Sequence, residues 1–413
     1  MKTFGFLLAV AVMSFLSPAG SAAAEQRWRD AVRLGPVREG IAMAADGRGR
    51  VLIAWDAEDV IRWRFAHRGV TGRIETPAPG APAAALDDRG GAVLAWGAFE
   101  DCKACTRGSV SFAARPPGRR AFKTSRRGAS NVMSGPPTLA LAPSGRAAWA
   151  WEGGPFLGIG NTPYAAPGLR LIPSRRIPSD VSLGWLDSGI WLATWMIWSG
   201  PQRPALVAGA GADTASLLRD RRRWLTLPTS PDFEPSCPRV ATAPRGAQLA
   251  AWDHQRWRDG KLQRRIMLAG RQPDGTPIAP RPVTRWAAPD RVACPAVAMA
   301  SDGWGAVAWL VGDFEDRRVR VATRPPGGSL GPSRTVARGE RAAAIDVSVA
   351  RGGGVLAVWA AAAGAGPVRA AMLGRRPRTL AASGTDPRAI LQPDDTATVT
   401  WRAAQTAWMA RRR

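Results

Sequence analysis

Acidic side chains follow the apolar runs of this sequence, and they are the residues best suited to chemistry. These carboxylates are Asp56, Glu58, Asp59, Glu100, Asp101, Asp253, Asp313, Glu315 and Asp316. Gathered at one opening, they could bind calcium or a basic ligand, or act as an acid and base pair in glycoside hydrolysis. They could also pair with nearby arginines and keep loops solvated, which is the interpretation we favour. No Asp-x-Asp-x-Asp-Gly calcium loop is present, which weakens the metal interpretation.

Few other catalytic side chains are available. The chain has two histidines, His67 and His254, and no Gly-x-Ser-x-Gly motif accompanies either. Its only tyrosine, Tyr164, lies in a Pro- and Gly-rich stretch. We therefore assign no catalytic residue.

Two tryptophans, Trp198 and Trp257, lie in segments where no packing rule requires them. An exposed aromatic ring could stack on a sugar or a peptide, or it could simply cover a neighbouring loop. We place Trp257 with the carboxylates as a candidate ligand-binding residue.

Basic residues dominate the charge of the chain, which is +25 at pH 7. Such a charge draws a protein towards anionic surfaces. The arginines of one expected face form a candidate anion-binding surface: Arg115, Arg119, Arg120, Arg324, Arg375 and Arg376.

A short apolar run that ends on tryptophan recurs eight times and indicates the elements that carry these residues. The final tryptophans are Trp55, Trp96, Trp151, Trp195, Trp252, Trp309, Trp359 and Trp401, spaced 41 to 57 residues apart. Repeats of this length containing several short strands are typical of propellers and arrays. We expect these tryptophans to have one packing role between repeats.

Each repeat can be divided into four strands, a to d. Strands a and b read as apolar throughout, as strands buried on both faces do, and the tight turn between them contains Gly with Asp or Ser in most repeats. The last repeat has only three strands, 387–391, 397–401 and 406–411, whereas residues 27–33 resemble a lone strand d. We predict an all-β fold, an eight-bladed β-propeller of four-stranded blades in which the N-terminal strand completes the C-terminal blade. Seven blades are the alternative.

On these repeats the chain resembles secreted bacterial β-propellers of the broad sialidase-like or WD40-like kind, and the resemblance covers the whole mature chain at the level of the fold. No Gly-His or Trp-Asp signature recurs, and the sialidase Asp box is missing. Residues 301–304, Ser-Asp-Gly-Trp, come nearest to that box, but in the wrong place and with the wrong spacing. A shared fold does not imply an activity.

Four cysteines fall into two pairs. Cys237 and Cys294 each precede proline and lie 15 residues before the tryptophan of their repeat. This equal register predicts a disulfide between adjacent blades, provided that the Cα atoms come within about 7 Å. Cys102 and Cys105 form a Cys-x-x-Cys sequence with no helix after it, for which we predict a local disulfide.

The first 24 residues resemble a secretory signal peptide: Lys2, an apolar stretch over 4–16, and alanines at 22–24. We therefore expect residues 25–413 to form one β-propeller domain in a secreted or cell-envelope protein. Export makes nucleic acid an improbable partner.

We expect a non-catalytic binding or scaffold protein, with its arginine-rich face on anionic envelope components, and we lean against an enzyme. The alternative is a secreted glycoside-active or other hydrolytic propeller that uses the acidic loops at the channel mouth. No cofactor or metal is expected. An unidentified protein or envelope polymer is the expected partner of a monomer, and peripheral contact with a membrane is possible.

Overall fold

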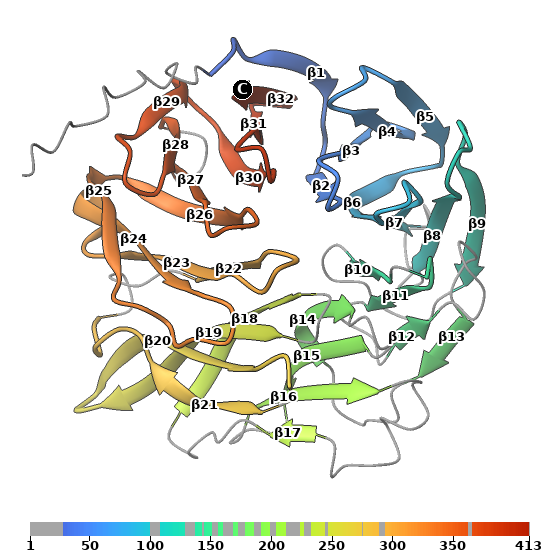
Figure 1. Ribbon diagram of the computed structural model, residues 1–413. Coiled ribbons are helices and arrows are strands. Elements are labelled where there is room, and N and C mark those ends of the chain that lie inside the picture. The colour runs from blue at the N-terminus through green and yellow to red at the C-terminus, as the bar shows by residue number, and fades with distance from the viewer. Residues whose placement is uncertain are drawn as a thin grey trace, which may run out of the picture.

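The computed structural model describes residues 28–99, 108–128, 137–142, 144–150, 156–159, 168–171, 178–185, 191–198, 204–211, 224–226, 233–243, 247–274, 276–288, 294–361 and 366–412. The fold is a β-propeller. Within these ranges the chain forms eight four-stranded antiparallel sheets arranged around a common centre (Figure 1). A single 3-10 turn, η3 (Phe314–Asp316), is the only helical element described. No helix in the described ranges is long and apolar enough to cross a membrane.

The first four sheets follow the chain from the N-terminal side. Their strands are β2 (Ile41–Ala45), β3 (Val51–Ala57), β4 (Val60–Phe65) and β5 (Thr71–Glu75); β6 (Pro79–Leu86), β7 (Ala92–Phe99), β8 (Gly108–Arg115) and β9 (Lys123–Gly128); β10 (Thr138–Leu141), β11 (Ala147–Ala150), β12 (Phe156–Ile159) and β13 (Gly168–Leu171); β14 (Pro178–Trp185), β15 (Trp191–Trp198), β16 (Pro204–Gly211) and β17 (Trp224–Thr226).

The other four sheets continue in the same order around the centre. Their strands are β18 (Phe233–Thr242), β19 (Gln248–Arg258), β20 (Lys261–Arg271) and β21 (Pro277–Pro282); β22 (Ala296–Met299), β23 (Gly305–Val311), β24 (Arg317–Arg324) and β25 (Arg334–Glu340); β26 (Ala342–Val349), β27 (Val355–Ala361), β28 (Val368–Met372) and β29 (Arg378–Ala381); β30 (Thr385–Leu391), β31 (Ala397–Ala403), β32 (Thr406–Arg412) and β1 (Val32–Pro36).

The last of these sheets is built from both ends of the chain. Strand β1 pairs antiparallel with β32, with Val32 opposite Met409 and Pro36 opposite Thr406. Outside the strand, the amide of Arg29 donates to the carbonyl of Arg411 at 2.8 Å.

In six of the sheets the tryptophan of the second strand packs in a core cluster that spans two sheets, as the repeat predicts, whereas Trp252 packs with Met267 and Ala269 of its own sheet. Every residue of β3 is buried. Trp96 joins Leu52, Ala54 and Leu86 in one core cluster, and its indole N–H donates to Thr76 Oγ1 in the neighbouring sheet at 3.1 Å. In the third repeat Trp149, two residues before the expected Trp151, is fully buried, while Trp151 lies outside the described residues.

Where the connection between the first two strands of a sheet is described, it is a tight turn at the end of the sheet beside the centre of the molecule. In the first sheet the Asp46 carboxylate accepts hydrogen bonds from the amides of Arg48 and Arg50, which closes the turn locally. Asp87 does the same for Arg89 and Gly91 in the next sheet. We call these segments the a–b turns; the turns at the other end of the second strand are the b–c turns.

Candidate functional site

A cavity of about 400 Å³ opens at the centre of the propeller, on the face of the a–b turns. Its wall comes from seven of the eight sheets and is mostly small or aliphatic, with Leu86, Val349 and Leu391 among its members. The polar side chains in the wall are Asp46, Asp87, Asp88, Thr242, Ser301, Ser348 and Arg351. Pockets of this size with a few polar groups in an apolar wall are typical binding sites for small molecules or segments of larger ones.

The turn that carries Asp88 is held in place by the turn of the preceding sheet. The Asp88 carboxylate accepts a hydrogen bond from the amide of Gly47 at 2.6 Å. The Arg50 guanidinium donates to the carbonyl of Asp88 at 2.8 Å. That guanidinium lies against Gly90, which has φ +90°, and a Cβ there would come within 2.2 Å of Arg50 Nη1. The position of Asp88 therefore depends on glycine at position 90.

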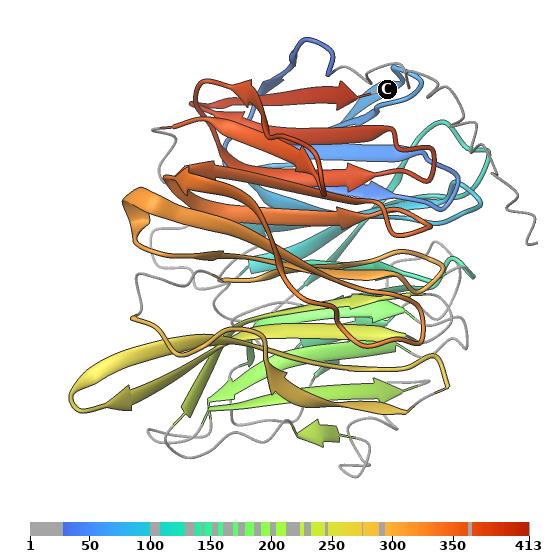
Figure 2. The same cartoon turned by 60° about the vertical axis from the view of Figure 1, so that its left-hand side comes forward.

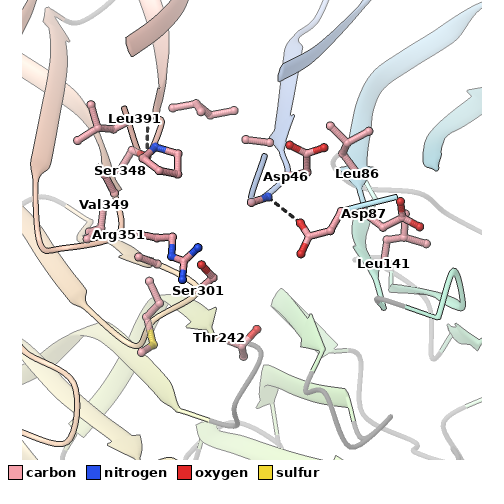
Figure 3. Close-up of a pocket in the computed structure, with 18 of the residues that line it drawn as sticks. Asp46, Leu86, Asp87, Leu141, Thr242, Ser301, Ser348, Val349, Arg351 and Leu391 are labelled. Carbon is pink, nitrogen blue, oxygen red and sulfur yellow. Dashed lines mark hydrogen bonds between the residues drawn. The ribbon is translucent and has the colours of Figure 1, made fainter. Parts of the chain in front are cut away.

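The turn that carries Arg351 is held in a similar way by the sheet of β22 to β25. The amide of Gly352 donates to Asp302 Oδ2 at 2.7 Å. The Trp304 ring covers Gly353, where a Cβ would come within 2.8 Å of it. Among the described residues no ion pair or hydrogen bond engages the Arg351 side chain, which is exposed and lines the cavity opposite Asp46 and Asp87 (Figure 3).

The other two carboxylates of the wall are occupied within their own turns. Asp46 is buried, accepts two backbone amides and forms an ion pair with Arg50. Asp87 is also buried, and its carboxylate accepts the amide of Gly91 at 2.7 Å. Asp88 is exposed and is therefore the carboxylate of this wall best placed to reach a ligand.

Two of the carboxylates named from the sequence, Asp56 and Asp253, are fully buried near the b–c turns. Asp56 accepts the amides of Glu39 and Gly40, each at 2.8 Å, and so fixes the connection into its own sheet. Burial raises the pKa of the Asp56 carboxyl above its usual value, and the two amide hydrogen bonds offset only part of that rise. Asp253 pairs with Arg264 at 3.4 Å. We do not include either residue in the candidate site.

The other acidic candidates whose burial is described are exposed, but they lie in two different connections between strands. Glu58 and Asp59 form the turn after β3, and Asp313, Glu315 and Asp316 lie around η3. Glu315 forms an ion pair with Arg341 at 2.7 Å. Glu100 and Asp101 lie outside the described residues.

His254 lies beside Trp286 and has little access to water. Burial, followed by the charge of Arg265, lowers the pKa of His254 to about 4. Burial also lowers the pKa of His67, with Arg68 adding to the effect. Both imidazoles are therefore neutral near pH 7, and neither lines the central cavity.

The six arginines of the predicted anion-binding face divide into two kinds. Arg324 is 1% exposed and donates to the carbonyl of Gly328 and to the Gln272 side chain of the neighbouring sheet. Arg115 lies 4.3 Å from the Phe65 ring centroid, and burial lowers the pKa of Arg115. Both link adjacent sheets, whereas four others are exposed: Arg119, Arg120, Arg375 and Arg376.

The predicted disulfide between Cys237 and Cys294 is confirmed, with Cα atoms 5.6 Å apart. A disulfide agrees with a compartment outside the reducing cytosol. Cys102, Cys105 and the expected signal peptide at 1–24 lie outside the described residues. The ranges described contain no group of three or more His, Cys, Asp or Glu residues able to hold a metal ion.

Asp88 and Arg351 were not singled out as site residues on the sequence. The available signal was a departure within the a–b turns, where Asp-Asp-Arg-Gly (87–90) and Arg-Gly-Gly-Gly (351–354) replace the more common Asp-Gly or Ser-Gly. Such a sequence difference can also have no functional effect, so only the cavity that they share distinguishes these two turns from the other a–b turns.

Solved structures share the propeller architecture at very low sequence identity. An ulvan lyase described as a new family of polysaccharide lyase has a TM-score of 0.47 and 10% identity, over 93% of this chain and 95% of its own. The α-L-arabinofuranosidase of Fusarium graminearum has a TM-score of 0.47 and 8% identity, over 94% of this chain and 98% of its own. The α-L-arabinanase of Penicillium chrysogenum has a TM-score of 0.46 and 10% identity, over 81% of this chain and 94% of its own. No family model and no curated protein sequence matches the chain.

These comparisons correct the function expected from the sequence. We favoured a non-catalytic binding or scaffold protein and leaned against an enzyme, but the neighbours named above are carbohydrate-active enzymes. The alternative, a glycoside-active propeller, agrees better with them. Likeness at this level shows the fold alone, so the residues that could do chemistry must be found in the geometry of this chain.

Proposed function

We propose that this protein is a carbohydrate-active enzyme that cleaves an anionic glycan in the central cavity. The observation that carries this proposal is the arrangement of Arg351, with no ion-pair partner among the described residues, and the exposed Asp88 in the wall of one cavity. A guanidinium binds a carboxylate or sulfate group strongly, because it offers several N–H donors in a planar fork. The hydroxyl-bearing residues Thr242 and Ser301 supply hydrogen bonds suited to sugar hydroxyls.

The number of available carboxylates favours elimination over hydrolysis. Glycoside hydrolysis ordinarily uses two carboxyl groups, and two of the three in this wall, Asp46 and Asp87, are buried and bound to their own turns. Elimination from a uronic acid needs one base and one group that offsets the charge of the substrate carboxylate. We assign these roles to Asp88 and Arg351.

The proposed step balances without a cofactor. Asp88 accepts the proton from the ring carbon next to the uronate carboxylate, whose negative charge is offset by Arg351. The electron pair released forms a carbon–carbon double bond, and the glycosidic C–O bond at the adjacent carbon breaks. The departing alkoxide takes a proton from water, and the hydroxide formed takes the proton held by Asp88, which restores the carboxylate.

The surroundings of the cavity support an anionic substrate. Arg48 and Arg89 are exposed in the same two turns as Asp46 and Asp88, and the whole chain carries +25. A field of this sign raises the local concentration of a polyanion at the opening.

We also propose that the eight sheets form an eight-bladed ring closed by strand β1, in a protein that works outside the cytosol. The pairing of β1 with β32 supports this closure, as does the Gln392 side-chain hydrogen bond to the carbonyl of Gly49 at 2.6 Å. Export is supported by the disulfide between Cys237 and Cys294.

Incubation with a panel of polyuronates, with neutral arabinan for comparison, tests the activity. We expect new reducing ends together with the ultraviolet absorbance of an unsaturated uronate, and no product from arabinan. Reducing ends without that absorbance would indicate hydrolysis and overturn the elimination step. No product from any glycan, with folded protein, would overturn the activity itself.

Two substitutions test the assigned residues. Asp88→Asn keeps the oxygen that accepts the Gly47 amide but removes the base, so kcat should fall by about a hundredfold or more. Arg351→Ala should mainly raise KM, and Arg351→Lys should recover part of the loss. The matched controls are Asp259→Asn and Arg334→Ala, exposed residues outside the cavity, which should leave turnover unchanged. Full activity in Asp88→Asn would contradict the assignment.

A further inference from the structure

The hairpin of β19 and β20 is the longest strand pair described, with 11 residues in each strand against 7 or 8 in most second strands. It is the yellow hairpin that projects from the molecule in Figure 2. Its turn consists of Asp259 and Gly260 with φ of 53° and 68°, the two-residue turn that Asp-Gly favours. The extra residues therefore form a paired, well-defined arm and not a loose loop.

An exposed tryptophan stands next to the tip of this arm. Trp257 is 66% exposed, the most exposed large apolar side chain described. Its cross-strand partner is Leu262, so the two side chains lie on the same face. The polar side chains further along that face, Gln255 and Arg264, are bound to the buried Asp253 at 3.1 and 3.4 Å. The tip thus presents two apolar side chains, Trp257 and Leu262, while the polar side chains beside them are bound to Asp253.

The other face of the arm is cationic. Arg258 and Lys261 are directly opposite each other across the strands, and both are exposed. Like charges directly opposite each other destabilise a hairpin. The neighbouring Asp259 carboxylate, 3.6 Å from Arg258, offsets part of this repulsion. Further along, the Trp286 ring has a guanidinium 4.0 Å away (Arg256) and another 4.2 Å away (Arg265).

The charge of the whole arm has the same sign. Residues 253–265 contain five cations against two carboxylates, Asp253 and Asp259, each already near an arginine. An anionic partner would relieve the repulsion between these cations.

We propose that the β19–β20 hairpin docks the protein on an anionic phospholipid bilayer, with Trp257 entering the interface and Arg258 and Lys261 contacting lipid headgroups. Tryptophan favours the boundary between headgroups and acyl chains, and lysine and arginine are attracted to an anionic leaflet. A glycan fits less well, because stacking on Trp257 would lack free polar partners on the same face. One inserted ring and a few cations give reversible, salt-sensitive binding.

The position of the arm agrees with this role. The tip lies at the b–c end of β19, whereas the central cavity lies at the a–b end of the second strands. Docking through the hairpin would therefore leave the cavity facing away from the membrane. Vesicle binding needs no turnover and is therefore independent of the proposed activity.

Flotation with vesicles of phosphatidylcholine, with and without phosphatidylglycerol, tests the proposal on the full mature chain. We expect binding to the anionic vesicles that falls as salt increases, and little binding to phosphatidylcholine alone. Trp257→Ser should weaken binding several-fold. Arg258→Glu with Lys261→Glu should weaken it by at least about fivefold for each residue.

The matched control is Arg334→Glu with Arg338→Glu, which makes the same change of charge at exposed residues of the edge strand β25. It should bind nearly as well as the unaltered protein; an equal loss would overturn the proposal in favour of a general effect of charge. Circular dichroism verifies that each variant is folded. Unchanged vesicle binding in Trp257→Ser and in the hairpin double variant would also overturn it. So would weakened binding of these variants to a soluble polyuronate while vesicle binding is retained, since the arm would then be a glycan-binding surface.

Discussion

Individual residues of one type take opposite roles in this propeller, and burial decides between them. Arg324 is enclosed and donates to a carbonyl and to the Gln272 side chain, whereas Arg351 is exposed beside the cavity. A buried guanidinium satisfied by several acceptors is expensive to remove, because its partners lose their donors. Arginine therefore serves this molecule both as a link between blades and as a candidate ligand-binding group.

His254 provides a prediction at the same scale. Its pKa is lowered to about 4 by burial and by Arg265, so the folded protein keeps the imidazole neutral where the unfolded chain, with a pKa near 6.5, binds a proton. The free energy of unfolding should therefore fall as pH decreases from about 6.5 to 4, by about 2 kcal/mol from this residue. Urea denaturation at several pH values, compared with His254→Gln, measures the difference in slope. Identical slopes in the two proteins would contradict the buried, neutral histidine.

At the scale of elements, turns and strand ends of adjacent sheets hold one another. The amide of Ala389 donates to the half-buried Asp346 of the neighbouring sheet at 2.9 Å, and Leu391 donates to Ser348 at 2.8 Å. The Cys237–Cys294 disulfide joins two further neighbours covalently. Because each sheet contacts mainly its two neighbours, such links determine how cooperatively the sheets unfold.

Removal of the disulfide should weaken the link between the β18 and β22 sheets. The bond spans 57 residues, and the chain-entropy model assigns about 4 kcal/mol to a loop of that length. We expect Cys237→Ser with Cys294→Ser to lower the free energy of unfolding by about this amount in guanidinium titration. Reductant should destabilise the unaltered protein and leave the double variant unchanged. A double variant as stable as the oxidised protein would show that the bond contributes little.

At the scale of the whole molecule, the two ends of the chain share a sheet. Strand β1 covers β32, which would otherwise be an exposed edge beside the sheet of β2 to β5. Met409 of β32 packs in a core cluster with Val37, Ile41 and Trp55, so the C-terminal strand is joined to the first sheet. Edge strands left open tend to pair with other molecules.

A chain that begins at Arg38 should therefore be less stable and more prone to associate than a chain that begins at Trp28. It lacks β1 and the backbone hydrogen bonds that residues 29–37 make to β32 and to Gln405. We expect several kcal/mol of lost stability in thermal unfolding, and oligomers in size-exclusion chromatography. A chain that begins at Trp28 keeps those contacts and is the control. Equal stability of the two shortened chains would exclude a structural role for β1.

The repeat, the strands and their turns are predictable from the sequence, because they depend on side chains close together along the chain. Apolar runs ending on tryptophan predicted the second strands, and Asp-Gly turns such as that of Asp46 closed the hairpins as expected. Equal register predicted the Cys237–Cys294 pair, since equivalent positions in adjacent repeats are neighbours in space.

Which charged residues are free to bind a ligand depends on the packing of the sheets and is not visible in the sequence. Asp56 and Asp253 resembled ligand-binding carboxylates but are enclosed by their own sheets, whereas Asp88 and Arg351, 263 positions apart, meet at one cavity. The physical reason is that burial and convergence at the centre depend on how the sheets are arranged around it. An arginine or aspartate in a short segment has the same sequence signal whether its charge is satisfied by a backbone amide, a neighbouring sheet or a ligand.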